Sequence, residues 1–480
     1  MENIIKQTVG VLQEIYEKNL RNLVGGKSIH SACSELYLDV QKIGLMILKN
    51  NLELLDKDIR EIDGRVDRYK IDGTTKKKLL CELGEVEFTK TRYHDVKNNE
   101  YLYLLDKYLS IESEERMTDG VRERILDEAI DSSYKKGGKR ASETIKVSKG
   151  TTKNIVDGLK IETIKVTKKC KEKKQVDYLY IDCDEAHINI QNKGGKKKNA
   201  ISKLLYIYDG KEKDNFSSKR NHLINPYYIS GIYGGKAGNL ELFNEAYRHI
   251  ENNYEVNTIK KIYINGDGAL WIKEGENIIP NSKFVLDSFH MYESMRKATS
   301  HLQDSQDDAI DEMINNIKNN NRDEFDITFN TIESYAKTDK EEKRINEQWT
   351  YLSNNFDSIT LRLKGDKSII GCSAEGHVSH ILAERMTSRP MGWSIRNADK
   401  MSKLRAYKLN GGNIRTLIDN QRNRIDFKLD YGLERLEKPK YCQNRSYYKE
   451  EYSECGKYYD IINVELSAQV RKRFCIQGIL

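Results

Sequence analysis

Proline is scarce in this chain, with four among 480 residues, and this scarcity excludes long proline-rich linkers between domains. The eight cysteines include no C-x-x-C pair, which argues against a disulfide framework and against a zinc-finger module. No stretch approaches the roughly 20 apolar residues that a membrane-spanning helix needs. The N-terminus also lacks the basic region and apolar run of an export signal. These absences predict a cytoplasmic protein with reduced thiols and no membrane segment.

The net charge is small, because 81 lysine and arginine residues face 74 acidic residues and leave a formal charge of +7. Basic residues nevertheless cluster at Lys168–Lys174, Lys193–Lys198 and Arg471–Arg473. Such clusters suit a polyanionic partner, although a solvated loop is the commoner explanation for any one of them. The length predicts two to four domains, at roughly 100–200 residues for each domain.

The first part of the chain predicts two regions of different texture. Apolar residues at spacings of three to five predict a helical N-terminal region at 1–75. Residues 84–93 then alternate with period two, and a turn precedes 101–104, which predicts a small β-hairpin. We therefore expect a β-hairpin and a helix-turn-helix-like DNA-binding region at 76–165.

The helix-turn-helix outline lies at the end of that region. Tyr134–Ile145 predicts one helix and Lys149–Leu159 a second, with Ser148 as its N-cap. In such motifs the start of the second helix meets base edges and phosphates. An ordinary helical hairpin fits the pattern equally well, because Gly137 and Gly138 weaken the first helix. The candidate DNA-binding residues of the second helix are Lys149, Thr151, Thr152 and Lys153.

Residues 175–300 change to strands with a helix among them, which is the order expected of a mixed sheet flanked by helices. The fold class is therefore α/β (α+β) with several domains. Helical texture then predicts a helical insertion at 301–360, and 361–480 would hold the second part of the core and the C-terminal region. The expected strands are 176–181, 186–190, 204–208, 227–233, 260–264 and 283–286, and the expected helix among them is 240–250.

Three acidic residues stand where a carboxylate is unusual. Asp184 lies on or just beyond an apolar strand, Asp267 ends another strand, and Glu375 stands where a helix begins. Carboxylates at sheet ends can converge, and hard oxygen ligands of this kind bind Mg²⁺ or Mn²⁺. Each residue also has an ordinary explanation, because Asp before Gly forms turns and Glu at a helix start complements the helix dipole.

Four segments resemble the signature blocks of ISLre-type insertion-sequence transposases, which are distantly Mutator-like. These segments are LYIDCDEAHI, YINGDGALWI, NSKFVLDSFHM and GCSAEGHVSHILAERMTSRPMGWS. The resemblance covers most of the chain and implies a DDE enzyme with an RNase H-like core. It implies that Asp184, Asp267 and Glu375 are the catalytic acids and the metal ligands, with Mg²⁺ or Mn²⁺ as cofactor. It further implies a supporting D-x-x-H signature, which Asp287 and His290 provide.

Two of these positions keep an alternative. Asp182 stands two residues before Asp184 and therefore on the same face of a strand, so periodicity does not separate the two acids. Glu384 follows Glu375 by nine residues and would lie on a different face if one helix runs through both.

Basic residues in the last of the four segments are candidate DNA contacts. Arg385 and Arg389 follow the glutamate, and guanidinium groups match the geometry of phosphates. His377 and His380 could also contact a phosphate, but a histidine on a helix surface needs no function.

The sequence thus predicts a transposase of a bacterial insertion sequence, which cleaves the element ends and joins the freed 3′-OH to target DNA. Its partners would be double-stranded DNA and further copies of the same chain, and it would associate with the nucleoid. Two alternatives stay open: a metal-dependent DNA nuclease without strand transfer, and a non-catalytic DNA-binding protein derived from a transposase.

Overall fold

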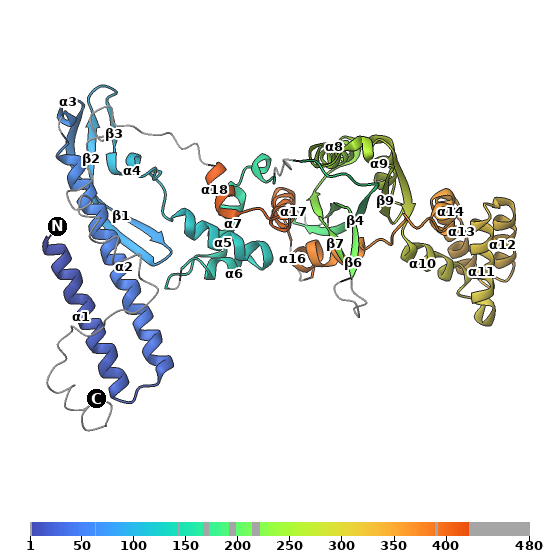
Figure 1. The fold of residues 1–480 in the computed structure, drawn as a ribbon, viewed down its shortest axis with the longest axis horizontal. Coiled ribbons are helices and arrows are strands. Elements are labelled where there is room, and N and C mark those ends of the chain that lie inside the picture. Colours follow the sequence, from blue (N-terminus) through green and yellow to red (C-terminus); the bar gives the residue numbers. More distant parts are fainter. Residues whose placement is uncertain are drawn as a thin grey trace. The chain divides into compact units, whose positions relative to one another are not determined.

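The computed structural model describes residues 2–62, 64–142, 144–166, 172–191, 198–213, 221–388 and 392–421 (Figure 1). These residues form two compact units. The first unit runs to Arg124 and includes Lys139–Val147, and the second comprises Ile125–Gly138 and Ser148–Gln421. Of the basic clusters, Arg471–Arg473 and most of the other two lie outside the described residues. No helix in the described part of the chain is long and apolar enough to cross a membrane.

The first unit joins a long helical hairpin to a three-stranded antiparallel sheet of order β1-β2-β3. Helix α2 packs against both α1 and β2, and Ser28 caps α2 by accepting a hydrogen bond from the Ser31 N–H. The expected hairpin is present as β2 and β3, and the expected N-terminal helices are present but end at Arg68, before the predicted boundary at 75, because β1 begins at Tyr69. The elements are α1 (Glu2–Val24), α2 (Ile29–Arg60), α3 (Arg65–Arg68), β1 (Tyr69–Cys81), β2 (Gly84–Asp95), β3 (Glu100–Leu102), α4 (Leu104–Tyr108) and the start of α5 (Asp119–Asp131).

Strand β1 is absent from the sequence prediction, because its exposed face carries lysine and threonine where an amphipathic strand carries a regular apolar and polar alternation. Charged pairs across the hairpin replace that pattern. Lys76 faces Glu87 at 3.5 Å, and Arg92 pairs with Asp72. Opposite charges across neighbouring strands stabilise a hairpin modestly, so this strand depends on its partner for its form.

A five-stranded mixed sheet of order β10-β9-β4-β5-β8 forms the centre of the second unit. Strand β5 runs antiparallel to both β4 and β8, whereas β9 runs parallel to both β4 and β10. The two strands expected at 176–181 and 186–190 are one strand, because β5 pairs with β4 from Tyr180 to Ile190. The strands are β4 (Tyr178–Ile190), β5 (Lys198–Tyr208), β8 (Tyr227–Gly231), β9 (Lys261–Gly266) and β10 (Ser282–Leu286), with a separate ribbon of β6 (Gly210–Lys213) and β7 (Asn221–Ile224).

The sheet is covered on both faces, and successive residues of β4 enter different cores. Leu179, Ile181 and Cys183 pack into the core that includes α8 (Gly235–Asn253) and α9 (Leu270–Ile278). Tyr180, Ala186 and Ile188 pack into the opposite core. The helices of the opposite core include α15 (Ala374–Val378), α16 (Glu384–Met386), α17 (Ile395–Leu409) and α18 (Ile414–Gln421) (Figure 1).

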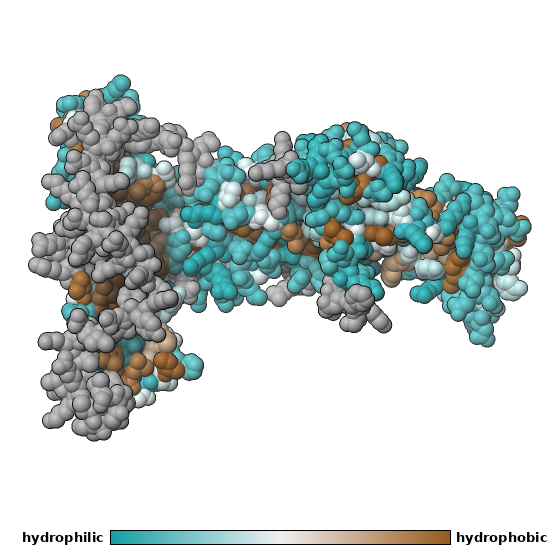
Figure 2. Space-filling view, in the orientation of Figure 1, coloured by the Kyte–Doolittle hydropathy of each residue, from teal (hydrophilic) through white to brown (hydrophobic). Residues whose placement is uncertain are grey.

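The helices expected at 301–360 are present and extend the first of these cores. Asn321 caps α12 (Arg322–Ser334) and Thr338 caps α13 (Asp339–Asn354), each through its side chain. The outer surface of this group is mainly hydrophilic (Figure 2), as the amphipathic pattern requires. The elements from β10 onward are α10 (Ser288–Thr299), η3 (Gln303–Ser305), α11 (Gln306–Lys318), α12 (Arg322–Ser334), α13 (Asp339–Asn354) and α14 (Phe356–Leu363).

The helix that begins at α15 contains a π-helical turn, η4 (Ser379–Ala383), before it continues as α16. Such a turn holds one residue more than an α-helical turn. The short 3₁₀ elements described in this unit are η1 (Ile161–Thr163), η2 (Val256–Thr258) and η3.

The predicted helix-turn-helix is only partly realised. Ser148 does cap α7 (Lys149–Gly158), since its Oγ accepts a 3.0 Å hydrogen bond from the Thr151 N–H. The first helix, α6 (Tyr134–Lys139), ends six residues before the predicted Ile145, and the described residues between α6 and α7 form no helix or strand. Helix α7 packs against α17 in the second unit, so residues 76–165 do not form one compact body.

Candidate active site

Asp184 and Asp267 lie next to each other at the point where β9 leaves β4. The last paired residues are Asp182 of β4 and Asn265 of β9, after which β4 continues and β9 ends. Gly266 permits this approach, because an added Cβ would lie 2.9 Å from the Cys183 carbonyl oxygen and 2.6 Å from Ile272 Cδ1. Gly268 follows with φ of +88°, a conformation that favours glycine. Two glycines therefore fix the loop that carries Asp267.

The surroundings of Asp184 and Asp267 disfavour two ionised carboxylates. Burial, with smaller contributions from the charges of Asp267 and Glu185, raises the pKa of Asp184 to about 6. The backbone N–H of Glu185 and the nearby His290 act in the opposite direction. Among the described residues, neither Asp184 nor Asp267 has a lysine or arginine ion-pair partner. The site therefore holds excess negative charge next to the sheet.

Asp182 has a different environment from Asp184, although both lie on one face of β4. The Asp182 side chain is fully buried. Its Oδ2 accepts hydrogen bonds from the Tyr206 hydroxyl at 2.8 Å and from the Ser373 N–H at 3.0 Å. Its Oδ1 accepts from the Asn265 amide at 2.8 Å and the Tyr208 hydroxyl at 3.1 Å. Protein donors occupy both oxygens, so the geometry favours Asp184 as the acid available to a ligand.

Glu375 is an exposed residue in the first turn of α15, which packs against β4. Two residues before it, Ser373 contacts Asp182, so the start of the helix lies over the same strand face as Asp184. Its competitor Glu384 is exposed on α16, where its charge acts on Arg405. In the described part of the chain, no three His, Cys, Asp or Glu side chains are grouped closely enough to hold a metal ion, so Glu375 does not complete such a group.

The D-x-x-H pair borders the acids. The Asp287 N–H donates a 2.9 Å hydrogen bond to the Gly266 carbonyl oxygen, directly before Asp267. His290, one turn into α10, acts electrostatically on Asp184 and lies 3.9 Å from Glu293. The structure thus places Asp184, Asp267, Asp287 and His290 around the ends of β9 and β10.

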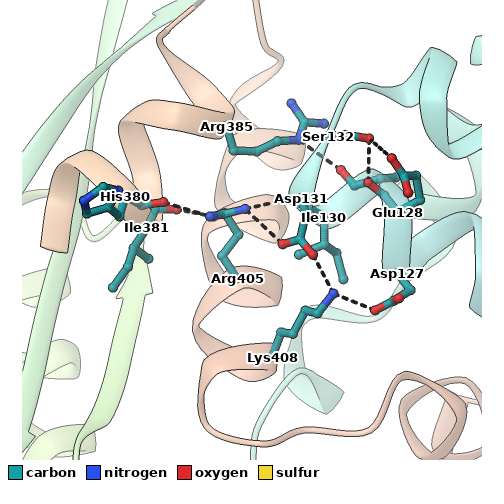
Figure 3. Close-up of polar contacts among 11 residues, drawn as sticks. Asp127, Glu128, Ile130, Asp131, Ser132, His380, Ile381, Arg385, Arg405 and Lys408 are labelled. Atoms are coloured by element: carbon teal, nitrogen blue, oxygen red, sulfur yellow. Dashed lines mark hydrogen bonds and ion pairs between the residues drawn. The ribbon is translucent and has the colours of Figure 1, made fainter. Parts of the chain in front are cut away.

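Arg385 does not face the solvent, which corrects its assignment as a phosphate contact. Only 3% of its surface is exposed, and its Nε donates to the Ala129 carbonyl oxygen at 2.9 Å (Figure 3). Its guanidinium also lies over the rings of Tyr134 and Trp393, and burial lowers its pKa to about 10. Arg385 therefore ties α16 to the end of α5, where unpaired carbonyl groups favour a cation.

Arg405 and Lys408 of α17 bind the same end of α5 (Figure 3). Arg405 donates to the Ile130 carbonyl oxygen at 2.9 Å, and Lys408 lies 2.7 Å from Asp127 and 2.6 Å from Asp131. No local pattern indicates these contacts, because the partners lie more than 270 positions apart.

The candidate DNA contacts of α7 fall into two groups. Lys149 and Lys153 are exposed and Thr151 is half-buried. Thr152 is fully buried, and its hydroxyl donates to the Ser148 carbonyl oxygen at 3.4 Å, so we withdraw it from the proposed contacts. Arg389 lies outside the described residues.

Three further residues around the acids were missed in the sequence. Arg362 Nη2 donates to Asn265 Oδ1 at 3.1 Å, and burial lowers the pKa of this arginine. Trp271 Nε1 donates to Glu185 Oε2 at 2.8 Å and so joins the start of α9 to β4. Asn265 had a visible signal, because it stands two residues before Asp267 as Asp182 stands two before Asp184.

Asp184 and Asp267 offer two oxygen donors of the kind that a hard divalent cation binds. Carboxylate oxygens are the ligands that Mg²⁺ and Mn²⁺ prefer. Asp184 and Asp267 repel each other and lack a cationic side-chain partner among the described residues, so a bound cation would relieve the unfavourable charge. The raised pKa of Asp184 has the same origin, namely burial without neutralisation.

Comparison with known proteins identifies similar chains of unassigned function. The sequence profile of the uncharacterised protein family UPF0236 matches residues 24–423. A UPF0236 protein of Caldanaerobacter subterraneus subsp. tengcongensis, whose name joins eleven loci, is 33% identical over 415 residues, which are 86% of this chain and 84% of the relative. Another UPF0236 protein of the same organism, whose name joins four loci, is 32% identical over 423 residues, or 88% and 87% of the two chains.

Among solved structures, the Drosophila P element transposase strand transfer complex is similar over 77% of this chain and 94% of that chain. The sequence identity is 11% and the TM-score is 0.22. A likeness at this score does not establish a shared fold.

Proposed function

Since this chain belongs to the uncharacterised protein family UPF0236, which has many paralogues in one genome as mobile elements do, we propose that it is a DNA transposase. The proposed enzyme cleaves DNA at the ends of its insertion sequence and transfers the freed strands to a target. The observation that carries the proposal is the adjacent pair Asp184 and Asp267, whose loop needs two glycines and which has no lysine or arginine ion-pair partner among the described residues.

The sheet supports an RNase H-like core for this enzyme. In that fold three antiparallel strands continue into two strands that run parallel to the first, and helices cover both faces. The order β10-β9-β4-β5-β8, with its orientations, meets this description. The proposed acids then stand on the central strand, at the end of its parallel neighbour, and on a helix that packs against the central strand.

In the proposed site, Asp184, Asp267 and Glu375 would hold two Mg²⁺ or Mn²⁺ ions. Bound ions of this kind activate an attacking oxygen and stabilise the leaving oxygen of a phosphodiester. Asp184 and Asp267 contribute a preformed pair of ligands on rigid elements. Glu375, with an exposed side chain on α15, contributes a ligand that can turn toward the pair. His290 contributes positive charge beside Asp184 when protonated.

Two successive displacements at phosphorus make up the proposed reaction. In the first, a water oxygen bonds to phosphorus while the bond to the 3′ oxygen breaks, which leaves a 5′-phosphate and a 3′-OH. In the second, that 3′ oxygen bonds to a phosphorus of target DNA while the target's own 3′ oxygen leaves. Lys149, Thr151 and Lys153 of α7 are the DNA contacts proposed among the described residues. Because two element ends must be joined in one reaction, we further propose that the chain acts as a homo-oligomer on DNA.

The substitution Asp267→Asn tests this proposal in the purified full-length chain. The substrates are duplexes taken from the DNA that immediately flanks its coding sequence, incubated with Mg²⁺ or Mn²⁺. We expect Asp267→Asn to lose about 100-fold or more of the cleavage rate and to keep DNA affinity, since it removes a proposed ligand outright. Asp177→Asn is the matched control, because Asp177 is an exposed carboxylate just before β4 that pairs with Lys260.

The outcomes separate the candidate functions. Cleavage followed by joining of 3′-OH ends to a second duplex supports a transposase. Cleavage without joining identifies a metal-dependent nuclease. DNA binding with no cleavage by the unmodified chain identifies a non-catalytic DNA-binding protein, and unchanged cleavage by Asp267→Asn would refute the assignment of the acids.

A further inference from the structure

Each of the three proposed acids has a buried or half-buried polar residue two positions before it in the sequence. These three residues are Asp182, Asn265 and Ser373, which precede Asp184, Asp267 and Glu375. Asp182 and Asn265 are fully buried within their strands. Ser373 is the N-cap residue of α15. We refer to Asp182, Asn265 and Ser373 together as the polar layer.

The polar layer is one hydrogen-bonded unit, although its members come from chain segments 83 and 191 positions apart. Asp182 stands in the middle. One of its carboxylate oxygens accepts from the Asn265 side-chain amide at 2.8 Å, and the other accepts from the Ser373 backbone N–H at 3.0 Å. The layer therefore connects β4, β9 and α15, the same three segments that carry or precede the acids.

Neighbouring groups hold the polar layer in place. Tyr206 and Tyr208 of β5 donate their hydroxyl protons to Asp182. Arg362 of α14 donates to the side-chain oxygen Oδ1 of Asn265 and also to the backbone carbonyl oxygen of Leu286, the last residue of β10. Each oxygen of Asp182 thus has two donors, and Asn265 uses both ends of its amide. A fully satisfied network of this kind permits only one arrangement of its elements.

The free-energy cost of burying the Asp182 carboxylate suggests that the polar layer positions the acids and does not only stabilise the fold. A buried carboxylate costs free energy, and a packed apolar residue in its place is often as stable or more stable. The charge of Asp267 acts on Asp184, and these like charges repel each other where β9 leaves β4. Residues two apart on a strand lie about 7 Å apart on the same face. The hydrogen bonds of the polar layer therefore lie two residues before the acids, where they hold β4 and β9 together against the repulsion between the carboxylates.

We propose that Asp182, Asn265 and Ser373 are positioning residues, which set the spacing of the Asp184, Asp267 and Glu375 carboxylates for divalent cations. This inference rests on the proposed function and explains what sets the positions of the proposed metal ligands. Asp182 links the other two, Asn265 fixes the loop of Asp267, and the Ser373 N–H fixes the start of α15.

The experiment compares Asn265→Ala with the matched variant Asn410→Ala. Asn410 is also buried in the second unit, and its side chain also makes two hydrogen bonds, to the N–H and carbonyl oxygen of Tyr228. Mn²⁺ affinity of the DNA-free protein is measured by electron paramagnetic resonance, together with thermal unfolding and the metal dependence of cleavage. We expect Asn265→Ala to weaken Mn²⁺ binding about 10-fold or more, while Asn410→Ala lowers the melting temperature without changing Mn²⁺ affinity.

Two further variants keep the inference testable if Asn265→Ala does not fold. Tyr208→Phe removes one donor to Asp182 and preserves the ring, and we expect weaker Mn²⁺ binding from it. Tyr180→Phe is its matched control, because the Tyr180 hydroxyl donates to the Ser368 carbonyl oxygen at 2.7 Å, and we expect this variant to bind Mn²⁺ as the unmodified chain does.

The possible failures are distinguishable. If the unmodified chain binds Mn²⁺ and cleaves DNA, but Asn265→Ala and Tyr208→Phe bind Mn²⁺ as tightly as Asn410→Ala does, the positioning role is refuted and the proposed function stands. If the unmodified chain neither binds Mn²⁺ nor cleaves DNA, the proposed function is refuted and the positioning role with it.

Discussion

The Tyr206 hydroxyl donates a 2.8 Å hydrogen bond to Asp182 Oδ2 in the interior of the second unit. Asp184, on the same face of the same strand, accepts a hydrogen bond from the N–H of the next residue, Glu185, at 2.7 Å. The strand alternation that makes the two acids equivalent in the sequence thus places them in different surroundings. One carboxylate is committed to the protein, and the other is available to a ligand.

This difference predicts opposite effects for two amide substitutions. Asp184→Asn should lose cleavage and keep or gain thermal stability, because a neutral amide removes the repulsion with Asp267. Asp182→Asn should lose about 1–3 kcal/mol of unfolding free energy, because the amide group meets donors that it cannot pair. Urea unfolding and a cleavage assay on both variants measure the contrast. If Asp184→Asn cleaves DNA at the normal rate and Asp182→Asn is as stable as the unmodified chain, Asp184 is not the catalytic acid and Asp182 is not the structural one.

Gly266→Ala should damage both stability and cleavage. The added methyl group would lie within 3 Å of Ile272 Cδ1 and of the Cys183 carbonyl oxygen, and overpacking of this kind costs about 1–3 kcal/mol. The loop of Asp267 must then move away from β4. Gly376→Ala is the control, because no atom lies within 4 Å of its added methyl group although it adjoins Glu375. Equal activity of the two variants would show that the close approach at Gly266 is unimportant.

Arg385→Met should destabilise the protein without changing its affinity for DNA. The substitution leaves the Ala129 carbonyl oxygen without this donor, which costs about 1–3 kcal/mol. The charge itself is buried, so the salt dependence of DNA binding should stay as it is. Thermal unfolding and fluorescence anisotropy at several salt concentrations test both statements. A reduced salt dependence would restore Arg385 as a phosphate contact.

Lys149→Ala and Lys153→Ala should each weaken DNA binding, if α7 contacts phosphates as proposed. Both lysines are exposed at the start of the helix. Each lost phosphate contact should lower the slope of log affinity against log salt by about 1. Lys318→Ala, an exposed lysine at the end of α11, is the matched control. A slope that stays the same in both α7 variants would exclude this helix from the DNA interface.

Unfolding stability should fall in mild acid because of His249. Burial lowers the pKa of this histidine to about 4, with a smaller contribution from Lys174, and its ring stacks on Tyr227 at 3.6 Å. The unfolded chain, with a histidine pKa near 6.5, binds the proton between pH 4 and 6.5 while the folded chain does not. Stability is therefore complete above pH 6.5 and decreases toward pH 4, by about 3 kcal/mol for this group.

His249→Phe isolates this contribution. The phenyl ring keeps the stacking surface and has no proton to bind, so the variant should lose less stability between pH 6.5 and pH 4. The difference between the two unfolding curves across that range is the measurement. Parallel curves would show that His249 does not titrate as stated.

The sequence predicted the elements that follow simple periodicity and missed those that depend on partners. The helical hairpin, the core strands and the Ser148 cap carry local signals, and the structure contains them. Strand β1 has no such signal, because cross-strand charge pairs stabilise it. The acidic residues inside β4 suggested a break in the strand, but pairing with β5 on one side keeps the strand continuous.

The candidate site divides in the same way. The residue types and spacing of the acids were visible in the sequence, whereas the contacts that distinguish Asp182 from Asp184 come from Tyr206, Tyr208 and Asn265 on other strands. Arg385 was misassigned because its burial against α5 arises from segments more than 250 positions apart. Long-range packing of this kind leaves no local pattern in a single chain.

The π-helical turn η4 lies between α15, which carries Glu375, and α16. It determines how far the side chains of α15 are rotated about the helix axis relative to those of α16. Its far end is anchored, because Trp393 donates to the Met386 carbonyl oxygen at 3.1 Å and both side chains are buried. Each residue of an α-helix rotates the chain by about 100°. Loss of one residue within η4 would leave the anchor in place and swing Ser373 and Glu375 by about that angle away from β4. The direction of the Glu375 side chain therefore depends on the number of residues in η4. We expect this helix to tolerate a substitution better than the deletion of one residue.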